Sequence, residues 1–117
     1  MEVHVRSTNI DLSPSLIDHV ERSLGRALDR FAHRVSRIMV VFSDINGPNR
    51  HGVDTRCNVV ADLGRSGTIV VEHIHEDAYA AADLASGRLK RAVRRRINRR
   101  RDAALRSRRG EQPWPAV

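Results

Sequence analysis

The sequence contains a single cysteine, Cys57, and only four large aromatic residues, which are Phe31, Phe42, Tyr79 and Trp114. One cysteine cannot form a disulfide within the chain, which excludes a small disulfide-stapled domain. The sequence also lacks an apolar run long enough to span a bilayer or to form the core of an export signal. We therefore expect a cytoplasmic protein without a membrane segment, whose core consists mainly of Val, Ile, Leu and Ala.

Acidic residues are scarce in one part of the chain, and basic residues are concentrated there. Residues 1–87 hold nine arginines against twelve acidic residues, a net charge of −3, whereas residues 88–117 hold twelve basic and two acidic residues, a net charge of +10. Such a block attracts a polyanion and displaces its counterions, which is typical of proteins that bind nucleic acid or an anionic surface. A solvated basic helix without a partner is the alternative interpretation.

The length predicts one domain over residues 1–109, followed by a flexible C-terminal tail over residues 110–117. Alternating or short β-branched runs bounded by turn residues predict strands, and apolar residues at three- and four-residue spacing predict helices. The predicted strands are residues 2–6, 36–45, 54–63 and 68–75, and the predicted helices are residues 14–32 and about 77–109. Ser13 and Pro14 supply an N-cap and a first-turn proline for the first helix.

The element order β-α-β-β-β-α predicts an α+β domain, in which two helices pack on one face of a four-stranded antiparallel sheet. The connection from Gly64 to Gly67 suits a hairpin between the last two strands. In that register Cys57 lies opposite His73, with His75 two residues further along the same face. Zinc uses such residues, but a second pair of ligands is missing, so we expect no metal site and no cofactor. We expect no catalysis either, because no glycine elbow or phosphate-binding loop frames the Ser, His and Asp residues.

One segment carries a resemblance to a known family. From Glu76 to Asp83 an acidic pair is followed by a tyrosine within a run of alanines, and the segment leads into Leu-Lys-Arg at residues 89–91. Together with the element order and the Ser-Pro helix start, it resembles the family of ribosome hibernation-promoting factors and ribosome-associated inhibitors, also called sigma-54 modulation proteins. The resemblance implies a fold similar to double-stranded-RNA-binding domains, binding to small-subunit ribosomal RNA in the mRNA and tRNA channel, and inhibition of translation.

The chain resembles the short form of that family, which lacks the C-terminal dimerisation domain of the long forms. Self-association is therefore left open, as is the role of the distinctive turn segment from Asn46 to Asp54. The expected partner is the small ribosomal subunit, with no membrane and no small-molecule substrate. Two alternatives remain: a regulatory protein–protein module that uses its arginines on an acidic protein surface, and a general binder of double-stranded RNA.

The candidate rRNA-binding residues lie on the two predicted helices. Four-residue spacing stacks three arginines on the first helix, although Asp18 and Asp29 offset part of their charge. The second helix directs its basic residues away from Leu89 and Val93, and guanidinium groups there would grip phosphate oxygens without reading sequence. The candidates are Arg22, Arg26, Arg30, Arg88, Lys90, Arg91, Arg94, Arg95 and Arg99.

The second predicted helix is longer than the predicted sheet. Residues 77–109 would extend roughly 50 Å as a helix, whereas a strand of about eight residues spans about 27 Å. We therefore expect the last helical turns to project beyond the sheet, to be mobile in the free protein, and to become ordered on RNA.

Overall fold

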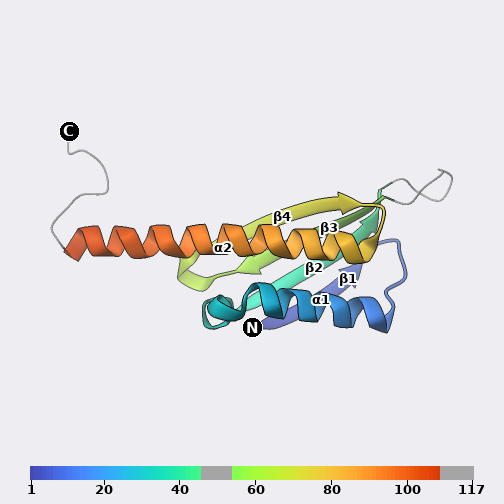
Figure 1. Ribbon diagram of the computed structural model, residues 1–117, viewed down its shortest axis with the longest axis horizontal. Helices are drawn as coiled ribbons and strands as arrows, with labels where there is room; N and C mark the ends of the chain where they lie inside the picture. The colour runs from blue at the N-terminus through green and yellow to red at the C-terminus, as the bar shows by residue number, and fades with distance from the viewer. Residues whose placement is uncertain (46–53, 109–117) are drawn as a thin grey trace.

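The computed structural model describes residues 1–45 and 54–108, which form a four-stranded sheet with two helices on one face (Figure 1). The strands lie across the sheet in the order β1 (Glu2–Ser7), β2 (Arg37–Asp44), β3 (Thr55–Asp62) and β4 (Thr68–His75). The helices are α1 (Pro14–Ala27) and α2 (Ala78–Arg108), and two 3-10 helices are η1 (Asp29–Arg34) and η2 (Gly64–Ser66). The predicted α+β fold is confirmed, and the likeness to double-stranded-RNA-binding domains stays a prediction.

Two of the sequence predictions concern residues outside the described ranges. The predicted C-terminal tail, residues 110–117, lies there, as does most of the turn segment that begins at Asn46. Of the helices in the described ranges, neither has an apolar stretch of the length that a bilayer requires.

The sheet is mixed, whereas the sequence predicted an antiparallel one. β1 pairs with β2 in parallel, with Glu2 opposite Arg37, while the β2–β3 and β3–β4 pairs are antiparallel. The helical crossover explains the difference, because α1 returns the chain along the sheet and β2 then runs in the same direction as β1. The hairpin prediction is confirmed, since Cys57 lies opposite His73 and Thr55 opposite His75.

Both helices begin where the sequence predicted, with capped N-termini. The Oγ atom of Ser13 accepts a hydrogen bond from the backbone N–H of Leu16 at 3.1 Å, and Pro14 occupies the first helical position. At the start of α2 the Oδ1 atom of Asp77 accepts the N–H of Tyr79 at 2.9 Å. These bonds satisfy backbone donors that have no partner within the helix.

The end of α1 differs from the prediction, which extended this helix to Ala32. α1 ends at Ala27, and the chain tightens into η1. Leu28 lies at the junction of α1 and η1. Its carbonyl accepts the N–H of Phe31 at 2.8 Å, which is the i to i+3 hydrogen bond of a 3-10 turn. Leu28 is fully buried and Phe31 packs against the core, so the tighter turn lets both side chains reach the interior.

The two helices are joined at Asp83 on α2. Its Oδ1 atom accepts a hydrogen bond from Ser23 Oγ and lies 2.8 Å from His19 Nε2, and both of these residues belong to α1. The ring of His19 stands edge-on to that of Tyr79, with the ring centroids 5.1 Å apart. This polar cluster fixes how α1 lies against α2, and so fixes the relative position of the basic residues on the two helices.

Candidate nucleic-acid interface

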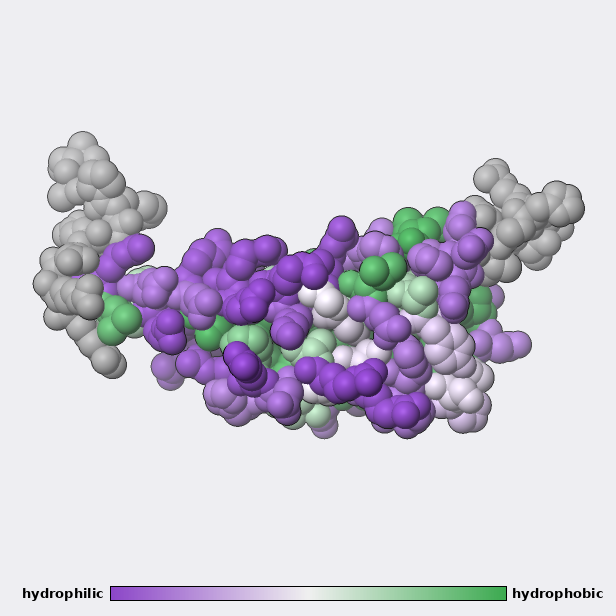
Figure 2. Space-filling model, in the orientation of Figure 1, coloured by the Kyte–Doolittle hydropathy of each residue, from purple (hydrophilic) through white to green (hydrophobic). Residues whose placement is uncertain are grey.

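α2 directs its basic side chains away from the protein core. Leu89 and Val93 are fully buried on the side of the helix that faces the sheet. The candidate residues on this helix are all exposed, as the sequence predicted: Arg88, Lys90, Arg91, Arg94, Arg95 and Arg99. Figure 2 shows the hydrophilic surface that covers α2, including the half that projects past the sheet.

The exposed cations of α2 occupy both flanks of the helix. With 3.6 residues per turn, successive side chains are about 100° apart, which sorts them into two rows. One row holds Arg88, Arg95 and Arg99, the other holds Lys90, Arg94 and Arg101, and Arg91 lies between them. A helix with cations on both flanks can contact phosphates on two sides at once, as binding along a nucleic-acid strand or groove requires.

Acids offset little of the charge of this surface, because the described part of α2 holds only Asp83 and Asp102. Of the ion pairs within residues 1–45 and 54–108, none involves an arginine or the lysine of α2. The first acidic residue of α2, Asp83, faces α1 and is bound to His19 and Ser23. The field of the α2 arginines therefore reaches solvent, where it attracts polyanions and favours release of their counterions.

Arg88 differs from the other candidates because it also holds two elements together. Its Nη1 atom donates a hydrogen bond to the carbonyl oxygen of Glu72 on β4 at 2.8 Å. Replacing Arg88 would therefore loosen the contact between α2 and β4 as well as remove a surface charge. A variant that tests nucleic-acid binding alone is better built without it.

Arg96 and Arg100 are two positioning residues that the sequence interpretation did not single out. Arg96 Nη1 donates to the carbonyl of Ser66 at 2.7 Å, and Arg100 Nη1 donates to the carbonyl of Arg65 at 3.0 Å. Both acceptors belong to the tip of the β3–β4 hairpin. The signal for this role was spacing, because Arg96 and Arg100 follow the buried Leu89 and Val93 by seven residues, which is two helical turns on the same face.

The projection of α2 beyond the sheet is confirmed (Figure 1). The helix of 31 residues continues to Arg108. The hydrogen bond from Arg100 to the hairpin fixes the first turn of this projecting half. Its mobility in the free protein and its ordering on RNA stay predictions.

Gly67, at the hairpin tip, lies beside the end of the Arg96 side chain and has a backbone conformation that favours glycine. Its φ of 92° lies in the region that L-residues rarely adopt, and an added Cβ would lie 2.9 Å from Arg96 Nη1. We expect Gly67→Ala to lower the free energy of unfolding by about 1–3 kcal/mol. Urea unfolding followed by circular dichroism measures this loss.

Gly25→Ala is the matched control, because an added Cβ there meets nothing within 4 Å. This residue lies inside α1, so the change should raise the free energy of unfolding by about 0.5–1 kcal/mol. Unfolding of Gly67→Ala at the wild-type urea midpoint would contradict the proposed role of the hairpin glycine.

The candidate residues near α1 are exposed but do not form one row on one helix. Arg22 and Arg26 are exposed on α1, and Arg22 is paired with Asp18 at 2.8 Å, as the predicted charge offset implies. Arg30 is exposed but belongs to η1, because α1 ends at Ala27. The predicted row of three stacked arginines on one helix is therefore wrong, since the 3-10 turn rotates Arg30 out of the i, i+4 series.

Cys57 is a core residue of β3. It is 1% exposed, and burial raises the pKa of its thiol to about 12. The thiol therefore stays protonated at neutral pH, whereas both nucleophilic attack and metal binding require the thiolate. His73 lies opposite in the sheet, but within the described ranges no group of three His, Cys, Asp or Glu residues is arranged to hold a metal ion.

Comparison with known proteins identifies the family. The profile described as sigma 54 modulation protein / S30EA ribosomal protein matches residues 3–101. The chain belongs to this family. Similar members include the ribosome hibernation promotion factor of Bacillus subtilis, 31% identical over 104 residues, and the ribosome hibernation promoting factor of Azotobacter vinelandii, 30% identical over 94 residues. These matches cover 86% and 80% of the chain, and 52% and 79% of the relatives. The chain thus spans about half the length of the Bacillus relative.

Solved structures of similar proteins agree with the fold. The N-terminal domain of Protein Y from Thermus thermophilus has a TM-score of 0.68 and 29% identity, with 81% of this chain and 98% of that domain covered. A ribosomal subunit interface protein from Coxiella burnetii has a TM-score of 0.71 and 20% identity, with coverage of 81% and 96%. The domain common to the family therefore has the two-layer architecture described above.

Proposed function

We propose that this protein binds the small ribosomal subunit through its rRNA and holds the ribosome in an inactive state. The observation that carries the proposal is the outward face of α2, whose exposed cations have no acidic partners among the described residues. Membership of the family and the names of the relatives from Bacillus and Azotobacter support it.

The binding mode follows from the chemistry of the surface. Arginine forks grip pairs of phosphate oxygens, and such contacts position a protein on RNA without reading its sequence. Preference for one ribosomal location must then come from shape, which α2 and its neighbour α1 supply. We place the protein in the channel of messenger and transfer RNA, where its presence excludes both ligands.

The proposed inhibition requires only that the protein occupies the channel, and it involves no chemical step. Cys57 has a protonated, buried thiol, so it offers no nucleophile at neutral pH. The proposal therefore needs neither a cofactor nor a small-molecule substrate. It places the protein in the cytoplasm, where the ribosomes are.

A cell-free translation reaction tests the proposal. We expect inhibition to be half complete at roughly half an equivalent of protein per ribosome and nearly complete at about one equivalent, because each occupied channel removes one ribosome. An excess of unrelated double-stranded RNA should not relieve the inhibition. Relief by that RNA would instead identify a general double-stranded-RNA binder, and absence of inhibition at a several-fold excess over ribosomes would refute the proposal.

A further inference from the structure

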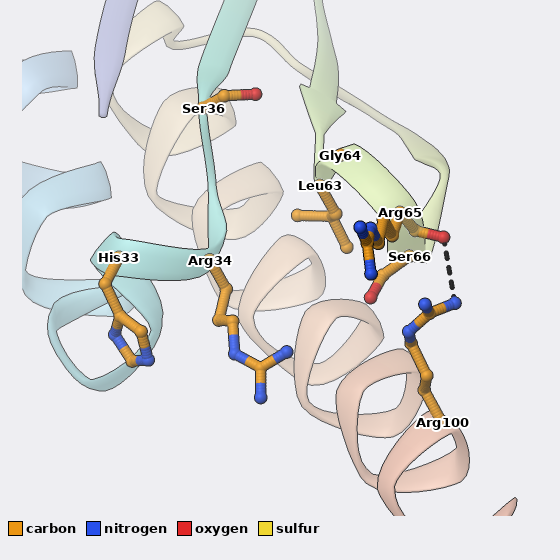
Figure 3. Close-up of a pocket in the computed structure, with 8 residues that line it drawn as sticks. All are labelled: His33, Arg34, Ser36, Leu63, Gly64, Arg65, Ser66 and Arg100. Carbon is orange, nitrogen blue, oxygen red and sulfur yellow. Dashed lines mark hydrogen bonds between the residues drawn. The ribbon is translucent and has the colours of Figure 1, made fainter. Parts of the chain in front are cut away.

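A hollow of about 470 Å³ lies where η1, the tip of the β3–β4 hairpin and α2 meet (Figure 3). η1 contributes His33 and Arg34, the hairpin contributes Arg65 and Ser66, and α2 contributes Arg100. In Figure 3 the Arg34 side chain extends from η1 toward α2, while Arg100 rises from α2 to the hairpin. Three arginines from distant parts of the sequence thus meet at the base of the projecting half of α2.

Two further depressions adjoin this hollow and add more positive charge. Arg96 and Arg99 line one of them and Arg101 lines the other, and Arg100 is shared by all three. None of the described residues that line them is acidic. Like charges gathered in this way repel one another, and a bound anion removes that repulsion.

The arginines here divide into fixed and free groups. Arg96 and Arg100 are fixed, because each donates a hydrogen bond to a carbonyl of the hairpin. Among the described residues, the side chains of Arg34 and Arg65 have no hydrogen-bond or ion-pair partner. The fixed pair joins α2 to the hairpin beside the hollow, and the free pair retains all its donors for a ligand.

We infer that this hollow binds a ligand with two or more adjacent phosphate groups, either a free oligophosphate or consecutive phosphates of an RNA strand. Each guanidinium fork engages a pair of phosphate oxygens, so cations that converge from three elements match an anion with several adjacent pairs of oxygens. Arg34, Arg65 and Arg100 are absent from the candidate rRNA-binding set on the outward face of α2. The inference therefore goes beyond the proposed function, and binding of the free anion does not depend on ribosomes.

Calorimetric titration of the protein alone with inorganic tripolyphosphate tests the site. At 0.15 M salt we expect one anion per chain, and the double variant Arg34→Gln/Arg65→Gln should bind about tenfold or more weakly, because two charge-assisted contacts are lost. The matched control, Arg91→Gln/Arg94→Gln, removes the same charge from the outward face of α2 and should change affinity less than about twofold. Both pairs are exposed, so neither substitution removes a core contact.

Two results would overturn the inference. One is an undetectable titration of the wild type, and the other is an equal loss of affinity in both double variants, which would mean diffuse attraction to a basic protein. Ribosome binding of the same variants then identifies the source of the phosphates. If Arg34→Gln/Arg65→Gln binds ribosomes as the wild type does, the ligand is a free oligophosphate. If it binds them weakly, and tripolyphosphate competes with ribosomes, the phosphates belong to RNA.

Discussion

Replacing Arg91, Arg94, Arg95 and Arg99 with glutamine is expected to weaken ribosome binding by roughly two to three orders of magnitude at 0.15 M salt. Each arginine that contacts a phosphate releases about one counterion, so the slope of log affinity against log salt should fall by about four. All four side chains are exposed and lie outside the buried stripe. Fluorescence titration of labelled protein with purified small subunits, at four or more salt concentrations, measures both quantities.

Folding and the location of the removed charge are controlled separately. Surface substitutions usually shift stability within about 0.5 kcal/mol, so the urea midpoint of the quadruple variant should stay close to that of the wild type. Arg6→Gln/Arg37→Gln removes two exposed arginines from the sheet strands β1 and β2, and should leave the salt slope almost unchanged. An unchanged slope in the quadruple variant, with folding intact, would mean that the outward face of α2 does not contact RNA.

Leu89→Ala should lower the free energy of unfolding by about 2–5 kcal/mol. Leu89 is 0% exposed and packs at the centre of the α2 stripe, so truncation removes apolar contacts and leaves a cavity. Leu84→Ala is the matched control, because it makes the same substitution in the same helix at a side chain that is 45% exposed. Its cost should stay below about 1 kcal/mol.

Urea unfolding measured for both leucine variants gives the comparison. An equal loss in the free energy of unfolding for both variants would mean that Leu89 is not buried against the sheet. The arginines of α2 would then not face outward as described. The orientation of the basic face therefore depends on this measurement as well as on the binding data.

Local patterns predicted much of the fold. The Ser13 cap, the four strands and the β3–β4 register all follow from residues close together in the sequence. The parallel direction of β1 and β2 was also predictable, because a helix that connects two neighbouring strands of one sheet returns the chain along the sheet, but the sequence interpretation did not use this rule. The early end of α1 is a tertiary effect, since burial of Leu28 and Phe31 outweighs helical periodicity that continues through this segment.

The sequence predicted which way the candidate interface faces, but not the hydrogen bonds that join α2 to β4 and to the β3–β4 hairpin. Leu89 and Val93 marked the buried side of α2, which was enough to place the exposed arginines outward. The roles of Arg88, Arg96 and Arg100 were not predictable, because their acceptors are backbone carbonyls 16 to 35 residues away along the chain. Charge alone does not separate an arginine that holds a hairpin from one that faces solvent.

Sedimentation with purified small ribosomal subunits through a sucrose gradient tests the central claim, that this domain is a ribosome-binding protein. At low salt the protein should migrate with the subunits, nuclease digestion of the rRNA should release it, and rising salt should release it progressively. Protein found only in the free fraction at low salt would contradict the account. Retention on the particle after nuclease digestion would indicate a protein partner instead of RNA.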